Sequence, residues 1–510
     1  MIVSTAGGES GFGRSPRAWP YILAGTVGAA TLGFELVAAR VANLLVGVSL
    51  YGWTGVIGAT LAGLALGFAI GARQRSNTAA ADARLVGTWA ITAAIAAVGA
   101  TLLLTAPPVA LTLERVPRIA RLPLPLVFLA FIPALLLGLA VPSLARRAID
   151  TQHRLGQRAG GLGAALAAGN LVGAFTTGVW LIPAVGTRGS SLVWAGALVL
   201  ASGRPWPLVP LVVLGAVALA TPHACLRESA YQCIAIRMET GDRGRAVHVL
   251  YLDGLPHTHV VPDDPRHLAH DYLIPVVEVA ASLRPVGEPP PTILIIGGGG
   301  YSLARYFRSV YPNAPVEVFE IDPVVTEVAR GWLGLTDDPL TRIVHGDARQ
   351  TLRLIPADRR YDLIVLDAFA DIVVPMQFVT AEFNALVASH LNPDGRYIAL
   401  VHDRTDRGRL LPAYVRTMEA AFPAVDVLAA GPGVRWRSPL SRTWAVVGAP
   451  AALEEAQLRR ALRFTANGPF PTLSEIMPAT ERARLRALPG PPILTDDHAP
   501  VEQLALLLFE

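Results

Sequence analysis

Residues 292–301 read TILIIGGGGY, and this stretch decides how the second half of the 510-residue chain folds. Residues 292–296 are β-branched or apolar, which is typical of a strand buried on both faces. Four glycines follow, and helical periodicity then runs over residues 301–310. Glycine permits a tight turn and the close approach of a ligand, and a helix N-terminus offers unpaired N–H groups. The pattern therefore predicts a strand, a glycine turn and a helix that hold a nucleotide-type ligand.

Three more strands are expected downstream, at residues 316–321, 342–344 and 361–366. Each one delivers an acid at its carboxyl end: Glu320, Asp347 and Asp367. An acid about 20 residues past the glycines is where this topology holds ribose hydroxyls. Ligands of open α/β sheets bind beyond the carboxyl ends of the strands, so we expect the glycines and the three acids to share one cleft.

Asp322 has a different expected role from the three acids of the cleft. It is followed by Pro323, and proline is favoured at the first position of a helix. We therefore expect Asp322 to cap the helix that follows the second strand.

The first half of the chain has a different composition. The whole chain is 52% hydrophobic and 16% charged, against roughly 25% charged in globular domains, and the long apolar runs lie in residues 1–220. A membrane-spanning helix needs about 20 apolar residues. Seven candidate spans are found: 19–39, 51–72, 85–105, 124–144, 163–185, 190–201 and 206–220. Glycines at close spacing within these spans predict tight helix packing.

These features predict a multi-span α-helical membrane domain, a small β-domain and an α/β Rossmann-like domain of the class I methyltransferase type. The expected boundaries are 1–222 for the membrane domain, 223–288 for the β-domain and 289–510 for the Rossmann-like domain. The prolines at 289–291 close the linker before the first Rossmann strand.

The orientation in the membrane gives conflicting signals. Arginines gather in the N-terminal tail and in alternate loops, which the positive-inside rule places in the cytoplasm: Arg14, Arg17, Arg73, Arg75, Arg84, Arg146, Arg147, Arg154 and Arg158. Seven full crossings would then put the C-terminal half outside the cell, away from intracellular nucleosides. We therefore expect a multi-pass protein of the cell membrane whose catalytic domain lies in the cytoplasm.

Charge and cysteine content exclude other classes. The net charge of +4 comes without a basic and aromatic stripe, so no nucleic-acid partner is expected. The two cysteines, Cys225 and Cys233, exclude a disulfide framework. We expect two unpaired thiols; a single bond between them is the alternative, limited by the redox side of the membrane.

The ordered motifs resemble the spermidine synthase (polyamine aminopropyltransferase) family. The resemblance is carried by ILIIGGGG from Ile293, EIDP from Glu320, GDA from Gly346 and LDAF from Leu366. The family's small N-terminal β-domain is resembled by ESAYQ from Glu228 and LDG from Leu252. The segments DDPRHL from Asp263 and LTDDHAPV from Leu494 look like its membrane-fused bacterial branch.

The resemblance implies transfer of an aminopropyl group from decarboxylated S-adenosylmethionine to putrescine or a similar amine, giving spermidine and methylthioadenosine. The donor would be a co-substrate, with no tightly bound cofactor and no metal. By matching position, Asp367 would be the general base, and Glu320 would hold the ribose hydroxyls. The other implied nucleoside contacts are Gln232, Gly297, Gly298, Gly299, Asp347, Ala348 and Pro375.

The acceptor side departs from the family pattern. Gly300 stands where the family has an aspartate that binds the amine, and His257 stands where it has a glutamine. The second acid of the family's Asp-Ser-x-Asp-Pro loop falls one residue late, at Asp371, and a Tyr-His-Glu run is replaced around residues 270–272. Losing one charge-assisted contact costs roughly 1.5–3 kcal/mol. The candidate acceptor-side residues are Gly300, His270, Asp271 and Asp371.

Two other functions are left open. The nucleoside cleft fits an S-adenosylmethionine-dependent transferase with another acceptor, including a methyltransferase. A non-enzymatic membrane sensor or transporter with a degenerate synthase domain is the third interpretation. The lipid bilayer is the expected partner of the first half, and a homo-oligomer is left open.

Overall fold

The computed structural model describes residues 18–48, 50–74, 78–113, 115–148, 155–204, 208–241, 244–284, 289–431, 433–459 and 474–508. The chain divides into two compact units. The first comprises Met1–Ala42 and Tyr51–Ala224, and the second comprises Asn43–Leu50 and Cys225–Glu510. Of the arginines used to infer orientation, Arg14, Arg17, Arg75 and Arg154 lie outside the described residues.

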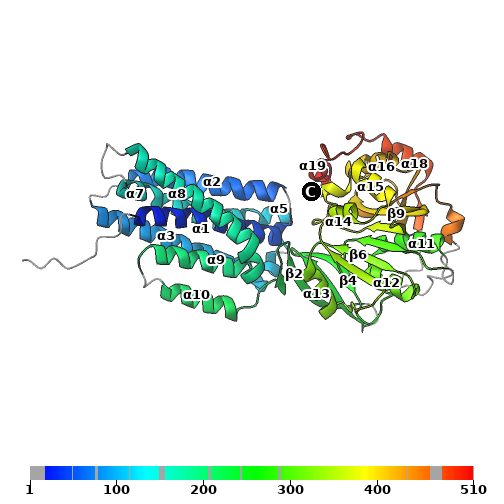
Figure 1. Ribbon diagram of the computed structural model, residues 1–510, viewed down its shortest axis with the longest axis horizontal. Coiled ribbons are helices and arrows are strands. Elements are labelled where there is room, and N and C mark those ends of the chain that lie inside the picture. The colour runs from blue at the N-terminus through cyan, green and yellow to red at the C-terminus, as the bar shows by residue number, and fades with distance from the viewer. Residues whose placement is uncertain are drawn as a thin grey trace, which may run out of the picture. The chain divides into compact units, whose positions relative to one another are not determined.

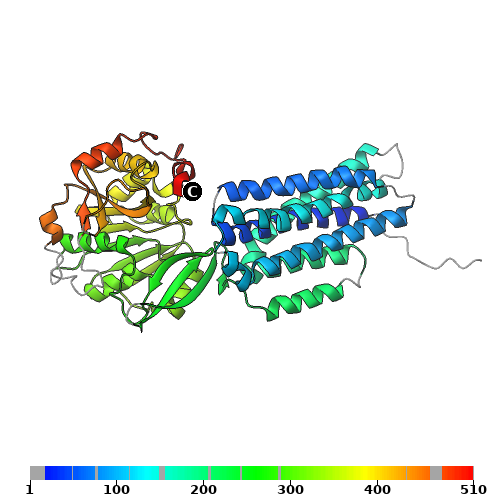
Figure 2. The same ribbon diagram turned by 180° about the vertical axis from the view of Figure 1, so that it is seen from behind.

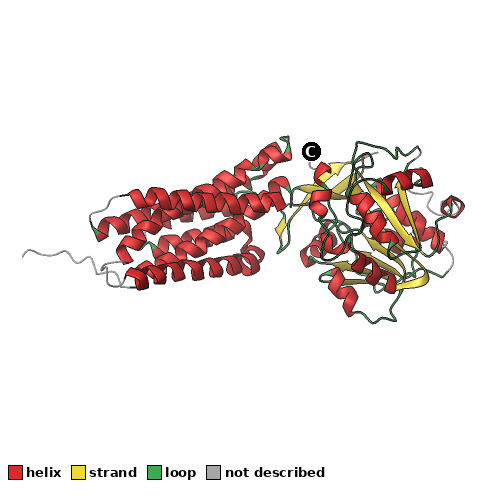
Figure 3. Ribbon diagram, turned by 90° about the horizontal axis from the view of Figure 1, so that it is seen from above, coloured by secondary structure: helices red, strands yellow, loops and turns green. Residues whose placement is uncertain are grey.

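The first unit is helical throughout its described residues (Figures 1 and 3). Its long helices are α1 (Trp19–Val46), α2 (Leu50–Arg73), α3 (Ala79–Leu104), α7 (Ile132–Ala148), α8 (Leu155–Phe175), α9 (Ile182–Ala201) and α10 (Leu208–Ala220). Short helices α4 (Pro107–Leu113), α5 (Arg118–Arg121) and α6 (Pro123–Pro125) connect α3 to α7.

Two π-helical turns interrupt this unit, each just before a proline. The turn η1 (Leu126–Phe131) precedes Pro133, and η3 (Thr176–Leu181) precedes Pro183. A proline has no N–H and its ring clashes with the carbonyl four residues earlier, so the backbone before it must widen locally. The Ile132 N–H accordingly bonds the Val127 carbonyl five residues back.

Glycines allow close helix contacts in this unit, as the spacing predicts. A Cβ on Gly169 of α8 would clash with the Gly25 carbonyl of α1, and a Cβ on Gly67 of α2 would clash with the Leu135 carbonyl of α7. Large apolar side chains on other faces of the helices, including Leu61 and Phe175, are exposed.

Five helices are long and apolar enough to cross a membrane by length and composition, where the sequence suggests about seven spans. They are Trp19–Val46, Leu50–Arg73, Ala80–Leu104, Pro123–Ala148 and Leu155–Ala201, with Val209–Ala220 as a shorter apolar helix. The difference arises because the expected fifth and sixth spans join into one run, bent at Gly186, where φ is +71°. The expected seventh span begins at Trp206, which lies outside the described residues.

The second unit begins with a four-stranded antiparallel sheet in the order β1-β2-β3-β4. Its strands are β1 (Arg227–Glu228), β2 (Cys233–Thr240), β3 (Ala246–Leu252) and β4 (Leu255–Val260). The β3–β4 hairpin turns at Asp253 and Gly254, both with positive φ, which is the Asp-Gly turn that matches the twist of a hairpin.

The expectation of two unpaired thiols is wrong in this structure. Cys225 and Cys233 form a disulfide with a Cα–Cα distance of 5.4 Å. The pairing of β1 with β2 sets Glu228 opposite Cys233, so the chain before β1 must turn back for Cys225 to reach Cys233. The two-residue strand β1 has no sequence pattern that predicts this pairing.

The larger sheet has eight strands in the order β12-β10-β11-β9-β8-β5-β6-β7. Its strands are β5 (Ile293–Ile296), β6 (Val316–Glu320), β7 (Thr341–His345), β8 (Tyr361–Leu366), β9 (Leu391–Asp403), β10 (Ala424–Ala430), β11 (Arg442–Ala449) and β12 (Ser474–Ile476). Strands β5 to β9 pair in parallel, whereas β11 is antiparallel to both β9 and β10. This arrangement confirms the predicted Rossmann-like fold of the methyltransferase type.

Helices cover both faces of this sheet (Figures 1 and 2). They are α11 (Ile274–Leu283), α12 (Ser302–Val310), α13 (Pro323–Trp332), α14 (Ala348–Leu354), α15 (Ala381–Ser389), α16 (Leu410–Glu419), α18 (Ala479–Arg486) and α19 (Val501–Leu504). The remaining short turns of helix are η5 (Asp271–Leu273), η6 (Met376–Phe378) and η7 (Leu506–Leu508).

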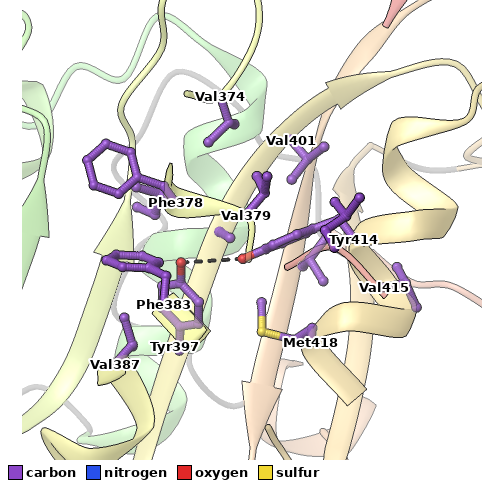
Figure 4. Packing of buried hydrophobic residues seen from close by; sticks show 14 of the residues in the cluster. Val374, Phe378, Val379, Phe383, Val387, Tyr397, Val401, Tyr414, Val415 and Met418 are labelled. Carbon is purple, nitrogen blue, oxygen red and sulfur yellow. Dashed lines mark hydrogen bonds between the residues drawn. The ribbon is translucent and has the colours of Figure 1, made fainter. Parts of the chain in front are cut away.

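Strand β5 shows why the sequence around residue 292 is uniformly apolar. Its alternate residues enter two different cores, Leu294 and Ile296 on one face and Ile293 and Ile295 on the other. Figure 4 shows part of the first core, where the buried Tyr414 hydroxyl donates to the Tyr397 hydroxyl at 3.3 Å. A strand buried on both faces has no polar side to display.

Candidate active site

The glycine turn after β5 has a backbone that only glycine fits. Gly297 has a φ of +103°, and a Cβ there would clash with the Asp367 carbonyl at the end of β8. Gly299 has a φ of +48°. Tyr301 also has a positive φ, +55°, and its buried hydroxyl bonds Thr326 Oγ1 at 2.6 Å, which anchors the start of α12. The glycine turn therefore lies directly against the end of β8, and the Tyr301–Thr326 hydrogen bond fixes its position.

Glu320 ends β6 and reaches back to this turn. Its Oε2 accepts hydrogen bonds from the N–H groups of Gly298 at 2.7 Å and Gly299 at 3.4 Å, and its Oε1 accepts from the Asp322 N–H at 2.8 Å. Burial raises the pKa of the Glu320 carboxyl, and the three N–H donors oppose that shift. The side chain is thus fixed against the glycine turn.

Asp322 caps α13, as predicted, and it does more than the sequence indicated. Its side chain accepts from the Val324 N–H at 3.0 Å, and its second oxygen accepts from Ser229 Oγ at 2.5 Å and Gln232 Nε2 at 3.4 Å. Gln232 lines the same cleft as Glu320. The cap therefore ties the loop between β1 and β2 to the edge of the cleft.

Asp347, Ala348 and Pro375 line the cleft as well. Asp347 caps α14, since its Oδ1 accepts from the Gln350 N–H at 2.9 Å. Asp347 therefore both caps α14 and lines the cleft. The predicted nucleoside-side residues all reach a common cleft: Gln232, Gly297, Gly298, Gly299, Glu320, Asp347, Ala348 and Pro375.

Asp367 follows the last residue of β8 and also lines the cleft. Within the described part of the chain, no group donates a hydrogen bond to its carboxylate. Burial alone raises the pKa of Asp367 to about 7. Burial raises the pKa of Tyr272, which lines the same cleft, well above its usual range, and the charges of Asp367 and Asp271 raise it further. A carboxyl that titrates near neutrality can take a proton from an amine.

The predicted acceptor-side residues are only partly brought together. Gly300 lines the cleft, but Asp271, His270 and Asp371 are not among its lining residues. Asp271 is exposed and forms an ion pair with Arg442 at 3.0 Å. Asp371 sits at a φ of +63° in the turn after β8.

His270 lies behind the cleft wall. Its ring stacks on Tyr272 with centroids 5.1 Å apart, and its Nε2 lies 3.4 Å from Nδ1 of His259. Burial and the neighbouring His259 lower the pKa of His270 to about 4. His270 thus supports Tyr272 as a neutral ring.

Residues from the small sheet complete the cleft opposite the glycine turn. Tyr231, His257 and Thr258 line it, together with Tyr272 and Phe369. Burial, with His270 nearby, lowers the pKa of His257 to about 4. The substitution at His257 is visible in the sequence, but nothing in a linear pattern indicates that Thr258 would face Gly300.

No protein-family model matches the chain. A polyamine aminopropyltransferase of Vibrio vulnificus is 28% identical over 170 residues, which are 33% of this chain and 52% of that protein. The eEF1A lysine and N-terminal methyltransferase of Danio rerio is 30% identical over 119 residues, which are 22% of this chain and 17% of that protein. The chain spans about half the length of the curated polyamine aminopropyltransferases it matches first.

Among solved structures, the crystal structure of a probable spermidine synthase from Corynebacterium glutamicum has a TM-score of 0.43 and 24% identity. The match covers 51% of this chain and 92% of that one. In sequence, between 33% and 45% of the chain is similar to polyamine aminopropyltransferases.

Proposed function

We propose that the second unit is a transferase that moves the aminopropyl group of decarboxylated S-adenosylmethionine to an amine. The observation that carries this proposal is the placement of Asp367 in the same cleft as Glu320 and the glycine turn. Its carboxyl accepts no hydrogen bond from the described residues and has a pKa of about 7. The similarity to polyamine aminopropyltransferases supports it.

In the proposed reaction Asp367 takes a proton from the ammonium form of the acceptor. The freed nitrogen lone pair attacks the aminopropyl carbon bonded to the sulfonium, a C–N bond forms, and the C–S bond breaks. Sulfur keeps the electron pair, which leaves neutral methylthioadenosine. Glu320 and the turn glycines would hold the ribose, and Asp347 with Ala348 would receive the adenine. Holding the two reactants in line supplies much of the rate.

The test uses the purified full-length chain in detergent. The donor is incubated with a series of amines, and methylthioadenosine release is followed; putrescine, the acceptor that the sequence resemblance implies, serves as the reference and would give spermidine. We expect release that depends on both donor and amine. Absence of release with every amine, together with measurable binding of the nucleoside, would contradict the proposal.

A second candidate function is methyl transfer from S-adenosylmethionine, which the similarity to the Danio rerio methyltransferase favours. The same assay distinguishes it, because methyl transfer releases S-adenosylhomocysteine instead of methylthioadenosine. Release of S-adenosylhomocysteine alone would replace the first proposal by the second.

We also propose that the first unit anchors the protein in the cell membrane and that the second unit lies in the cytoplasm, where the donor is made. The five long apolar helices and their exposed apolar side chains support the anchor. Extraction of cell membranes with alkaline carbonate should leave the chain in the pellet. Release into the supernatant would contradict a spanning anchor.

A further inference from the structure

The cleft has an acceptor half, which we define by the lining residues His257, Thr258, Tyr272, Gly300, Asp367 and Phe369. Three carboxylates line the whole cleft among the described residues: Glu320, Asp347 and Asp367. Glu320 is engaged by three N–H groups, and Asp347 caps α14. Asp367 is therefore the single carboxylate that the acceptor half offers to a cation.

Other anions cannot readily join Asp367. A side chain at Gly300 would bring its Cβ to 2.7 Å from Thr258 Cγ2 and 3.0 Å from Val260 Cγ2, so β4 occupies the space. Asp271 is committed to Arg442 at the surface, and Asp371 is not a lining residue. The loss of acids is thus built into the packing of β4 against the glycine turn.

Neutral groups stand in place of these acids. The low pKa of His257 leaves its ring uncharged at neutral pH, and Tyr272 stays protonated. Tyr272 and Phe369 add aromatic surface beside Asp367. No arginine or lysine lines the cleft in the described part of the chain, so an anionic acceptor finds no partner either. A charge taken out of water without an ionic partner is strongly disfavoured.

We propose that the acceptor is an amine with one cationic centre on an uncharged, apolar or aromatic body, and not a diamine. The single ammonium pairs with Asp367, and the body lies against His257, Tyr272 and Phe369. This inference rests on the proposed aminopropyl transfer and names the class of acceptor that the transfer would use.

The test compares two acceptors that differ by one amine group, n-butylamine and putrescine, with phenethylamine as an aromatic monoamine. The full-length chain in detergent is saturated with donor, and kcat/KM is measured from methylthioadenosine release. We expect butylamine and phenethylamine to exceed putrescine by about tenfold or more, the size of one unmade charge-assisted contact. Putrescine equal to or better than butylamine would overturn the proposal while leaving aminopropyl transfer intact.

A charge-adding variant makes the test independent of absolute rates. His257→Glu places a second carboxylate in the acceptor half, and it should shift the putrescine-to-butylamine ratio towards putrescine by about tenfold. His257→Gln adds no charge and should leave butylamine preferred, whatever its rate. An unchanged ratio in His257→Glu that still binds the donor would overturn the proposal. If the donor binds but no amine supports methylthioadenosine release, the proposed function is wrong, and the proposed class of acceptor is wrong as well.

Discussion

Glu320 Oε2 accepts a hydrogen bond from the Gly298 N–H at 2.7 Å, so the acid that ends β6 is bound to the turn that follows β5. The two strands are parallel neighbours, and their carboxyl ends therefore meet at one edge of the sheet. This bond fixes the carboxylate before any ligand arrives. A fixed acceptor loses little conformational entropy when it binds a ribose.

Glu320→Gln should weaken methylthioadenosine binding at least about tenfold, because the amide replaces a charged acceptor and presents an N–H to the Gly298 donor. Isothermal titration calorimetry on the purified chain measures this change. The matched control is Glu317→Gln on the same strand, since Glu317 bonds the Tyr361 hydroxyl at 2.6 Å and does not line the cleft. The control should keep its affinity. Equal affinity in both variants would show that Glu320 does not contact the nucleoside.

Asp367→Asn should lower kcat by about 10²- to 10⁴-fold, the usual contribution of a general base, with little change in nucleoside affinity. The amide keeps the shape of the side chain but cannot accept the proton of the ammonium. Asp394→Asn, an exposed change with the same loss of charge, is the control for net charge. A variant at Asp367 that turns over normally would remove the base from the proposed mechanism.

The pH dependence follows from the pKa of about 7 at Asp367. Only the ionised carboxylate can accept a proton, so kcat should rise tenfold per pH unit below pH 7 and level off above it. The rate is measured between pH 5 and pH 9 with the donor saturating. A flat profile through pH 7 would mean that another group limits proton transfer.

The raised pKa of Asp367 also makes the stability of the folded chain depend on pH. Burial raises the pKa of Asp367 from its usual 3.8, so the folded chain holds this proton more tightly than the unfolded chain. The favourable contribution is full below about pH 4 and is lost as the pH rises to about 7. Asp367→Asn should therefore melt at a higher temperature than the parent chain at pH 8, and the gap should shrink towards pH 4.

The local features of the fold and the cleft could be predicted from the sequence. Strand β5, the glycine turn and the cap at Asp322 depend on neighbouring residues, whose chemistry is visible in the chain. Contacts between distant segments could not be predicted. The Asp271–Arg442 ion pair joins residues 171 positions apart, and it removes an expected acceptor-side acid from the cleft.

The disulfide is an intermediate case between local and distant contacts. It spans only eight residues, yet it depends on the pairing of a two-residue strand that has no pattern of its own. The same holds for Thr258, whose contact with Gly300 depends on how β4 meets the glycine turn. Strand pairing within the small sheet decides the first outcome, and packing of β4 against the turn after β5 decides the second.

The redox state of Cys225 and Cys233 in the cell indicates on which side of the membrane the second unit lies. Their disulfide and the arginine distribution favour an oxidising side, whereas the proposed donor is intracellular. Because the proposed function requires the donor, we expect the second unit in the cytoplasm, and we expect the disulfide of this structure to be reduced there. Acid-quenched cells treated with a polyethylene-glycol maleimide should then show two additions before any reductant is used.

Cys225→Ser is the control for this labelling, because it leaves a single thiol that should take one addition with or without reduction. Labelling of the parent chain only after reduction would place the second unit on the oxidising side. The proposed donor would then be out of reach in the cell, even if the purified chain used it.

Substitutions at Gly300 test whether the packing of β4 excludes the acidic side chain that the family resemblance implies at this position. Gly300→Ala should destabilise the chain by about 1–3 kcal/mol, because its Cβ would press on Thr258 Cγ2, and Gly300→Asp should do the same. Thr258→Ser removes that methyl group and keeps the hydroxyl. The pair Gly300→Asp with Thr258→Ser should therefore regain part of the lost stability in thermal denaturation.

The double variant also carries a second carboxylate beside Asp367, so it should bind putrescine more tightly than the parent chain does. Gly300→Ala with Thr258→Ser has the same shape change without the charge, and it should show no gain. A single Gly300→Asp variant as stable as the parent would show that β4 leaves room for the acid. The depletion of acids in the acceptor half would then have no steric cause, and a second anion could be restored by one substitution.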